Sequence, residues 1–467
     1  MGSYRYLFKN IGLLTLSSFA TKLISFFLVP LYTNILTTTE YGTYDLFNTT
    51  IGVLLPILTL NIQEAVMRFA IDNKTSRKAI VTLGARYLLI GTAIVIAALI
   101  INSIFSLVDL LETYAIYFLL MFISQALSGV LLAYIRGINR IADLSVSSAM
   151  ASAITILCNI LFLVVFKLGL IGYFLANIIG PLMQDLFLLV RSGAIKEIAF
   201  QSEFPNEKQE MLAYCKPMIP NSIAWWVNNT SDRYIVIFFC GIAANGVYSV
   251  ASKIPSILNI FQAIFNQAWS LSAVQEFDPE DKSGFFSNIY RAYNCMMVIM
   301  CSGIIMLDKL LAKFLYAKDF YVAWKYVPWL TIAIVFGALS GHIGGVFTAV
   351  KNSKIFARST MIGAASNIVM NLALTPIMGA LGAAIATTIC YMIVWAMRYW
   401  NAKRYIKLRI NINRDVISYG ILLIQAIILL VISNNTILYG IEIALFVIIA
   451  FLYADDVILL AKKLLRR

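Results

Sequence analysis

The stretch that decides the fold runs from Phe19 to Ala70 and reads FATKLISFFLVPLYTNILTTTEYGTYDLFNTTIGVLLPILTLNIQEAVMRFA. Two apolar runs, each long enough to cross a bilayer as a helix, flank a short polar turn. Lys22 lies near the middle of the first run. A cation at that depth is costly unless it faces protein or a water-filled cavity. The stretch therefore predicts membrane helices that hold a charge in their interior.

The composition extends this prediction to the whole chain. The 467 residues are 61% hydrophobic and 13% charged, with a mean hydropathy of +0.84. A soluble protein of this length needs more charge to cover its surface. The apolar runs are continuous rather than alternating, which indicates helices and not the strands of a barrel. We expect an all-α integral membrane protein.

Runs of sufficient length number roughly fourteen. They lie near residues 11–36, 44–70, 80–108, 113–135, 145–166, 170–190, 213–240, 245–272, 285–307, 326–350, 357–377, 379–400, 415–433 and 437–460. About 27 of the 36 basic residues fall in the termini and the alternate loops on the same side. Positive loops stay in the cytoplasm, so both termini are expected there. The basic residues expected on the other side are Lys167, Lys309, Lys313, Lys318 and Lys325.

Two halves of the chain share motifs in the same order. An outer turn is expected at Glu40–Tyr44 and again at Ala244–Tyr248, where Gly-x-Tyr recurs at an offset of about 204 residues. Later turns at Gly169–Ala176 and Gly379–Ala386 share G-x-x-G-x-x-x-A. We predict two pseudo-symmetric six-helix lobes of the same orientation. The expected parts are a first lobe at 1–190, a cytoplasmic linker at 191–212, a second lobe at 213–404, and an appended helix pair with a basic tail at 405–467.

Two stretches carry a resemblance to a known family. They are FKNIGLLTLSSFATKLISFFLVPLYTNILTTTEYGTYDL, from Phe8 to Leu46, and TSDRYIVIFFCGIAANGVYSVASKIPSI, from Thr230 to Ile257. The chain resembles bacterial polysaccharide repeat-unit flippases of the multidrug/oligosaccharidyl-lipid/polysaccharide exporter superfamily. The resemblance implies a transporter of the bacterial inner membrane. It would move an undecaprenyl-diphosphate-linked oligosaccharide, such as an O-antigen or capsule unit, to the periplasmic leaflet by alternating access around a cationic central cavity.

Cations within spans are the candidate contacts for a diphosphate. Lys22, Arg233 and Lys253 would lower the cost of bringing phosphate charge into a low-dielectric interior. Asp232, the candidate for gating or ion coupling, is expected at the same depth as Lys253. The alternative reading pairs Asp232 with Lys253 as a clamp between two helices, and leaves Arg233 at the outer interface.

Glu64 and Arg68 stand four residues apart, in the order of a helical ion pair. The pair would anchor the end of the second span. In the alternative reading, Arg68 is an entry-side phosphate contact and Glu64 is a gating or proton-coupling carboxylate.

A group of aromatic and amide side chains in the seventh span suits a sugar. Trp225 and Trp226 would stack on sugar faces, and Asn228 and Asn229 would hydrogen-bond hydroxyls. The alternative is that they are ordinary residues of a membrane span.

Several other classes of protein are disfavoured. The loops are too short for a catalytic domain, and no P-loop occurs, so we expect no enzyme and no cofactor. Six scattered cysteines without C-x-x-C spacing indicate no metal site. The net charge of +13 is explained by topology and requires no nucleic acid. Expected partners are the lipid-linked substrate and membrane lipid, with a polysaccharide polymerase and a chain-length regulator as candidates. The rival functions are a cation-coupled multidrug exporter and a membrane polysaccharide polymerase or ligase.

Overall fold

The fold is helical throughout the part of the chain that the structure describes. A computed structural model describes residues 26–72, 75–350 and 352–458, and it contains no strand in those ranges. The helices form two compact units, one ending at Val227 and the other beginning at Asn228. The predicted all-α class is therefore confirmed.

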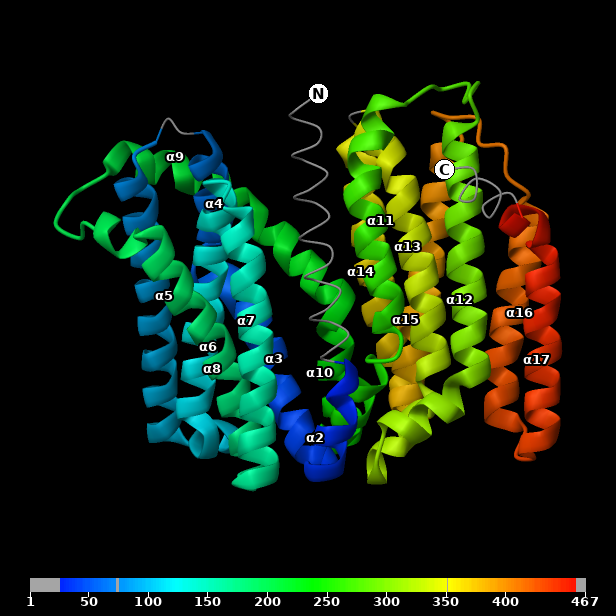
Figure 1. The fold of residues 1–467 in the computed structure, drawn as a ribbon, viewed down its shortest axis with the longest axis horizontal. Coiled ribbons are helices and arrows are strands. Elements are labelled where there is room, and N and C mark those ends of the chain that lie inside the picture. Colours follow the sequence, from blue (N-terminus) through cyan, green and yellow to red (C-terminus); the bar gives the residue numbers. More distant parts are fainter. Residues whose placement is uncertain (1–25, 73–74, 351, 459–467) are drawn as a thin grey trace. The chain divides into compact units, whose positions relative to one another are not determined.

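In the described residues, the first unit contains the helices α2 to α9 and the start of α10. The first of these helices are α2 (Val29–Ile35), α3 (Thr38–Leu58), α4 (Ile62–Asp72), α5 (Arg77–Phe105), α6 (Asp109–Gly137), α7 (Ile141–Asn159) and α8 (Gly169–Ser192). In Figure 1, α5 to α8 stand side by side, while α9 (Pro205–Cys215) lies across one end of them. Phe47 of α3 meets Phe118 of α6 at 5.1 Å and Phe174 of α8 at 5.6 Å between ring centroids. These rings form part of the core that holds the long helices together.

The residues that we expected in the first outer turn are helical. Thr37 caps the start of α3, because its side chain accepts from the Glu40 amide and the Glu40 side chain accepts from the Thr37 amide. Such a reciprocal capping box satisfies two amides that a helix start leaves open. The expected turn at Glu40–Tyr44 is thus the first part of α3, and the prediction of a turn there was wrong.

The second predicted span is broken. Between α3 and α4 the chain bends by 59°. Leu60 and Asn61 both have positive φ, at 51° and 54°. The left-handed region is strained for a side chain as large as leucine. The Asn61 side chain donates to the Ser222 hydroxyl at 3.1 Å, which holds the break in place.

The expected linker at 191–212 is a packed, largely helical segment of the first unit. It contains η2 (Ala194–Glu197) and most of α9. Arg86 of α5 donates to the carbonyls of Phe200 and Ser202, both at 2.7 Å. Met211 and Cys215 of α9 are fully buried in the same core as α4 and α5. The segment is therefore fixed to the first unit along its length.

The second unit holds the remaining long helices. They are the later part of α10 (Ile219–Ala251), α11 (Ser256–Gln275), α12 (Phe285–Leu315), α13 (Val327–Ala349), α14 (Ser353–Met378), α15 (Ala380–Ala402), α16 (Ile412–Val431) and α17 (Asn435–Leu452). Helix α10 kinks at Gly241, where φ is 84° and ψ is 170°. Asn245 to Tyr248 lie in the helical segment after this kink. The expected second outer turn at Ala244–Tyr248 was therefore also wrong, since the chain turns at Gly241.

The shared G-x-x-G motif has the same structural role in each unit. Gly169 and Gly379 adopt positive φ, at 54° and 63°, in the turns before α8 and α15. The second glycine of each motif approaches the backbone of the helix before it. A Cβ atom on Gly172 would lie 3.1 Å from the Phe162 carbonyl oxygen, and one on Gly382 would lie 2.3 Å from that of Leu374. The chain does turn directly before α8 and α15, but the residues from Gly169 to Ala176 and from Ala380 to Ala386 are helical, so the predicted turns were placed too late in the sequence.

Helix α13 occupies the centre of the second unit. In its most apolar 18-residue window, 83% of the residues are buried. It packs against α11, α12, α14, α15 and α16. Close approach needs glycine here, because a Cβ on Gly345 would lie 2.4 Å from Trp269 and one on Gly344 would lie 2.7 Å from Phe356. The Gly-rich segment in this span is therefore a packing surface.

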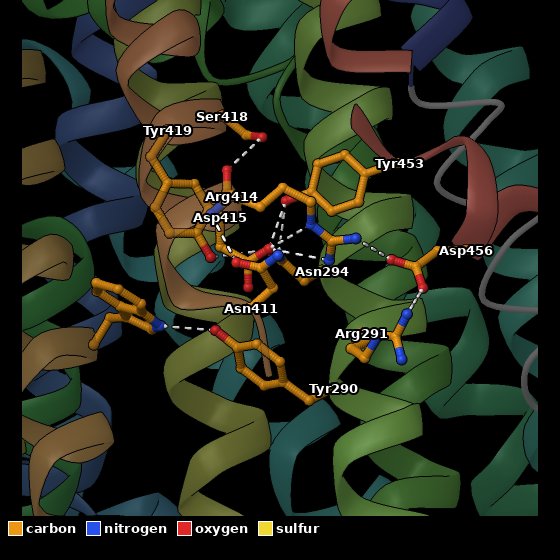
Figure 2. A network of polar contacts seen from close by, with 11 residues as sticks. Tyr290, Arg291, Asn294, Asn411, Arg414, Asp415, Ser418, Tyr419, Tyr453 and Asp456 are labelled. Atoms are coloured by element: carbon orange, nitrogen blue, oxygen red, sulfur yellow. Dashed lines mark hydrogen bonds and ion pairs between the residues drawn. The ribbon is translucent and has the colours of Figure 1, made fainter. Parts of the chain in front are cut away.

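An ionic network, which we call the arginine anchor, attaches the appended pair α16–α17 to α12 (Figure 2). Asp456 accepts from Arg291 at 2.6 Å and from Arg414 at 2.7 Å. Arg414 also contacts Asp415 at 3.2 Å, and the Tyr453 hydroxyl donates to Asp415 at 3.0 Å. Figure 2 shows these groups converging from α12, the start of α16 and the segment that follows α17. Their charges are matched, so the network holds the pair in place.

The membrane spans agree with the predicted ones where the structure describes them. Among the described residues, eleven helices are long and apolar enough to span a membrane, or up to twelve if α3 and α4 form one bent span. Most of the first expected span, 11–36, falls outside the described residues. The seventh expected span, 213–240, ends next to the Gly241 kink, whereas the eighth, 245–272, is broken between Ala251 and Ser256. The second expected span corresponds to the bent pair of α3 and α4, and the remaining expected spans each correspond to one helix.

Candidate functional site

The candidate site residues in the first unit are only partly placed. Lys22, the main candidate for phosphate binding, lies outside the described residues. Arg68 is exposed on α4 and pairs with Asp72 at 3.9 Å. The expected pair between Glu64 and Arg68 was wrong, because Arg68 turns to the next carboxylate along the helix instead. Both side chains of the observed pair are about half exposed. Such a pair stabilises the helix little, so Arg68 can exchange its partner easily.

Asp232 lies at the centre of a buried polar cluster in the second unit, which we call the Asp232 cluster. Its carboxylate accepts from the Tyr248 hydroxyl at 2.5 Å and from the Thr387 hydroxyl at 3.4 Å. Tyr248 follows the Gly241 kink in α10, and Thr387 is on α15. The kink therefore lets a tyrosine and a carboxylate of the same element face each other.

Two asparagines of α14 complete the Asp232 cluster. Asn367 donates to Thr387 at 3.4 Å. Asn371, one helical turn later, donates to the Asn367 carbonyl at 2.9 Å and to its side-chain oxygen at 3.1 Å. The side-chain oxygen of Asn371 is buried and has no hydrogen-bond partner. The cluster thus offers carboxylate, hydroxyl and amide oxygens, which are the ligands that hard cations and protons prefer.

Arg233 and Lys253 lie near this cluster in the sequence but in different local structures. Arg233 is half-buried on α10, and its backbone amide donates to Asp232 at 3.0 Å. Lys253 lies in the break between α10 and α11, at Ser252–Pro255. Among the ion pairs of the described residues there is none between Asp232 and Lys253. The clamp reading was wrong, because it placed Lys253 inside a continuous eighth span, whereas Lys253 lies in the break between α10 and α11.

The aromatic and amide group of α10 divides into packed and exposed members. The Trp226 indole donates to the Thr49 carbonyl at 2.9 Å, and Asn228 donates to the Thr360 carbonyl at 3.2 Å. Trp225 is 49% exposed. It lies four residues before Asn229, which is also exposed, so both are on one face of the helix. Asn229 accepts from the Tyr391 hydroxyl at 2.8 Å. Trp225 and Asn229 remain the better candidates for sugar contacts.

One buried cation escaped the sequence analysis. Arg398 of α15 is 5% exposed. It donates to the Ser340 carbonyl and to the hydroxyls of Ser359 and Thr360, each at 2.9 Å. It also stacks over the Phe356 ring at 4.1 Å. The guanidinium joins three helices through neutral acceptors. Arg398 was not predicted as a buried cation because it lies at the end of an apolar run. Asn367 and Thr387 were also missed, although a polar residue inside an apolar span is a signal that could have found them.

The polar groups are not arranged as a metal centre of the common kind. Within the described ranges, no three His, Cys, Asp or Glu side chains come together in a way that would hold a metal ion. His342 is buried and stacks on Trp269 at 4.0 Å between ring centroids. It serves the packing of α13.

Several solved structures share this fold. The structure is similar to the lipid II flippase MurJ in an inward closed conformation, with a TM-score of 0.70 and 15% identity over 95% of this chain and 99% of that one. It is also similar to an inward-facing multidrug resistance MATE family transporter of the MOP superfamily, with a TM-score of 0.66 and 13% identity over 82% and 94% of the two chains. A MATE structure in complex with MaL6 gives a TM-score of 0.58 at 13% identity, over 85% and 95%.

Sequence comparison gives the family. No curated protein matches the chain. The model of a family described as "Polysaccharide biosynthesis protein" matches residues 7–270, which is more than half of the 467 residues. With the transporter fold, this match confirms the resemblance at the level of family and fold. The chain belongs to the polysaccharide biosynthesis protein family.

Proposed function

We propose that this protein flips undecaprenyl-diphosphate-linked oligosaccharide repeat units, such as those of O-antigen or capsule, from the cytoplasmic to the periplasmic leaflet of a bacterial inner membrane. The observation that carries the proposal is a polysaccharide-biosynthesis family match on a fold similar to a lipid II flippase. Lipid II is itself a lipid-linked sugar, so the two substrates would share a lipid tail and a polar head group. Both termini lie in the cytoplasm, as the distribution of basic residues favours.

Cations bind the diphosphate in this proposal. Lys22, Arg233 and Lys253 attract it into a cationic cavity, and Arg68 is an entry-side contact. Arg68 suits that role because its ion pair with Asp72 is weak and about half exposed. Trp225 and Asn229 would contact the sugar. The lipid tail stays in the bilayer while the head group crosses by alternating access. A polysaccharide polymerase and a chain-length regulator would act on the product.

Gating or ion coupling falls to Asp232, with Glu64 as a second candidate. Asp232 is 7% exposed and is surrounded by hydroxyl and amide groups of three helices. A carboxylate at such a site binds or releases a small cation, and its hydrogen bonds then rearrange. That rearrangement would couple the cation to the packing of α10 against α14 and α15.

The test compares wild type with Lys22→Ala and Lys22→Arg in cells that lack the native gene, at matched expression. Lys196→Ala, an exposed lysine of the packed linker, is the control. Surface polysaccharide and the leaflet of the lipid-linked precursor are scored together. We expect loss with alanine, recovery with arginine, and precursor trapped on the cytoplasmic leaflet.

Each rival function predicts a different result. If the precursor reaches the periplasmic leaflet without this protein but stays unpolymerised, the protein is a polymerase or ligase and the flippase proposal fails. If the precursor flips normally while export of cationic drugs is lost, the multidrug exporter is the better reading. The MATE-like fold gives that rival its support.

Coupling is tested separately with Asp232→Asn in vesicles that contain the lipid-linked precursor. We expect flipping to lose its dependence on an imposed proton or sodium gradient. Asp319→Asn, an exposed carboxyl after α12, should keep that dependence. An unchanged gradient dependence in Asp232→Asn would remove Asp232 from the coupling role.

A further inference from the structure

Two carboxyls lie inside the interface between α12 and the appended pair, away from the arginine anchor. Asp308 of α12 and Glu442 of α17 are both fully buried, with 0% exposure. Both oxygens of Asp308 and one oxygen of Glu442 have no hydrogen-bond partner. A buried carboxylate without partners is very costly in a low-dielectric interior. These two groups therefore need an explanation that packing does not supply.

A chain of hydrogen bonds connects Glu442 to all three helices of the interface. The Ser302 hydroxyl of α12 donates to the Gln425 side-chain oxygen of α16 at 2.8 Å. The Gln425 amide then donates to the second oxygen of Glu442, also at 2.8 Å. This chain fixes the Glu442 carboxyl and turns its free oxygen away from Gln425. The three side chains joined by these hydrogen bonds, Ser302, Gln425 and Glu442, are all buried.

One cation lies near the two carboxyls but does not pair with them. Lys309 follows Asp308 in α12, and its ammonium group stands over the Trp324 ring, 4.6 Å from the centroid. It interacts electrostatically with both Asp308 and Glu442, yet no ion pair within 4.0 Å joins them among the described residues. Tyr439 of α17 also interacts electrostatically with Asp308. One lysine balances one carboxylate, so a single additional positive charge makes the group neutral.

The ligand that fits this group is a proton. Only three oxygens are free, from two side chains, whereas hard metal cations take about six or more oxygen ligands. The nearby ammonium group of Lys309 also repels a metal cation. A proton needs one oxygen, and it removes the buried charge outright.

We propose that Asp308 and Glu442 form a proton-binding site that controls how firmly the appended pair packs against α12. With the proton bound, the interface is neutral and α16–α17 stay packed on the second unit. When the proton leaves, an unbalanced charge is buried between three helices and the packing weakens at this end. The arginine anchor holds the other end, so the pair opens like a hinge. This site is independent of the proposed substrate.

The test measures protonated carboxyl groups in the purified full-length protein, in lipid nanodiscs, by infrared spectroscopy. Wild type, Asp308→Asn, Glu442→Gln and the double variant are titrated from mildly acidic to mildly alkaline pH. We expect wild type to show a carbonyl band of protonated carboxyls that fades with rising pH, and the double variant to lose the part of that band that Asp308 and Glu442 contribute. Asp319→Asn, which removes an exposed carboxyl, should keep the band.

Two results would overturn the proposal. One is a pH-dependent spectrum that is the same in wild type and in the double variant. The other is a stabilisation of the wild type by sodium, relative to choline at equal ionic strength, that the variants lose. In that case the site binds a metal cation. Asparagine and glutamine mimic the neutral carboxyl, so the variants should fold. If either does not, the other single variant still gives the comparison.

Discussion

The interface between α12 and the appended pair contains buried carboxyls towards both of its ends, in two arrangements. Asp456 is held by Arg291 and Arg414 at 2.6 and 2.7 Å. Asp308 and Glu442, at the other end, have no cation within ion-pair distance in the described part of the chain. Both places lie between α12 and the appended pair. The difference lies in the partners of each carboxyl.

This comparison separates charges that hold a structure from charges that can change. A carboxylate with two guanidinium contacts is held by charge-assisted hydrogen bonds, which are among the strongest in proteins. A carboxyl without such contacts is free to gain or lose a proton. The buried state of a charged residue is thus a weaker guide to its role than the identity of its partners.

The largest effect is expected from breaking the arginine anchor with Arg414→Ala. The change leaves Asp415 and Asp456 buried with fewer partners, and removing one member of a buried ion pair costs about 3–5 kcal/mol. The Tyr453 ring would also lose the guanidinium that lies 4.3 Å from its centroid. Thermal unfolding of the purified protein, followed by size-exclusion chromatography, measures the loss. An unchanged melting temperature would show that the anchor does not hold the pair.

A smaller effect is expected from Asp456→Asn, which keeps the shape of the side chain but removes its charge. Hydrogen bonds to charged groups contribute about 1.5–3 kcal/mol, so we expect a loss of about 2 kcal/mol in the free energy of unfolding. Denaturant titration in mild detergent gives this value. A change near zero would mean that Arg414 and Tyr453, rather than the charge of Asp456, stabilise the end of the interface at the arginine anchor.

Neutralising Glu442, at the end of the interface without ion pairs, should lower the free energy of unfolding less than either change to the arginine anchor. In Glu442→Gln, the new amide oxygen still accepts from Gln425, and we expect a change under about 1 kcal/mol at mildly acidic pH. At alkaline pH the wild type must bury a charge that the variant lacks, so the variant becomes the more stable of the two. The same titration at two pH values tests the sign. A large loss at both pH values would mean that this carboxyl is ionised and structural.

The smallest effect is expected from Lys407→Ala. Lys407 pairs with Glu280 at 2.8 Å, but the two side chains are 70% and 52% exposed. Exposed pairs contribute about 0.2–1 kcal/mol, and added salt weakens them. The variant is therefore the matched control for the arginine anchor. If Lys407→Ala lowers the free energy of unfolding as much as Arg414→Ala does, burial does not explain why the arginine anchor is the stronger contact.

The regular parts of the fold could be predicted because they depend on local sequence. Apolar runs gave the positions of the long helices, and Gly169 and Gly379 gave the tight turns before α8 and α15. Glycine is needed there for its positive φ, and this requirement is visible in the sequence itself. The outer turns were misplaced because a capping box at Thr37 and a kink at Gly241 set the helix boundaries.

The buried charges were harder to predict, since they depend on how helices end and rotate. We expected an outer loop from Leu307, where Lys309 and Lys313 end the apolar run. Helix α12 continues to Leu315, so Asp308 lies inside a helical interface. Asp232 was found from its depth in a span. Its partners Thr387 and Asn367 come from two other helices, and only the packing of α10, α14 and α15 brings them together.

The enclosure of α13 has a consequence for how the protein is made. A helix leaving the insertion machinery is at first surrounded by lipid, and the apolar sequence of α13 tolerates this. Its final neighbours include α14, α15 and α16, which are synthesised after it. Helix α13 must therefore exchange lipid for protein on most of its surface as those helices arrive. Larger side chains at Gly344 or Gly345 would obstruct that exchange, so they should lower the yield of inserted protein.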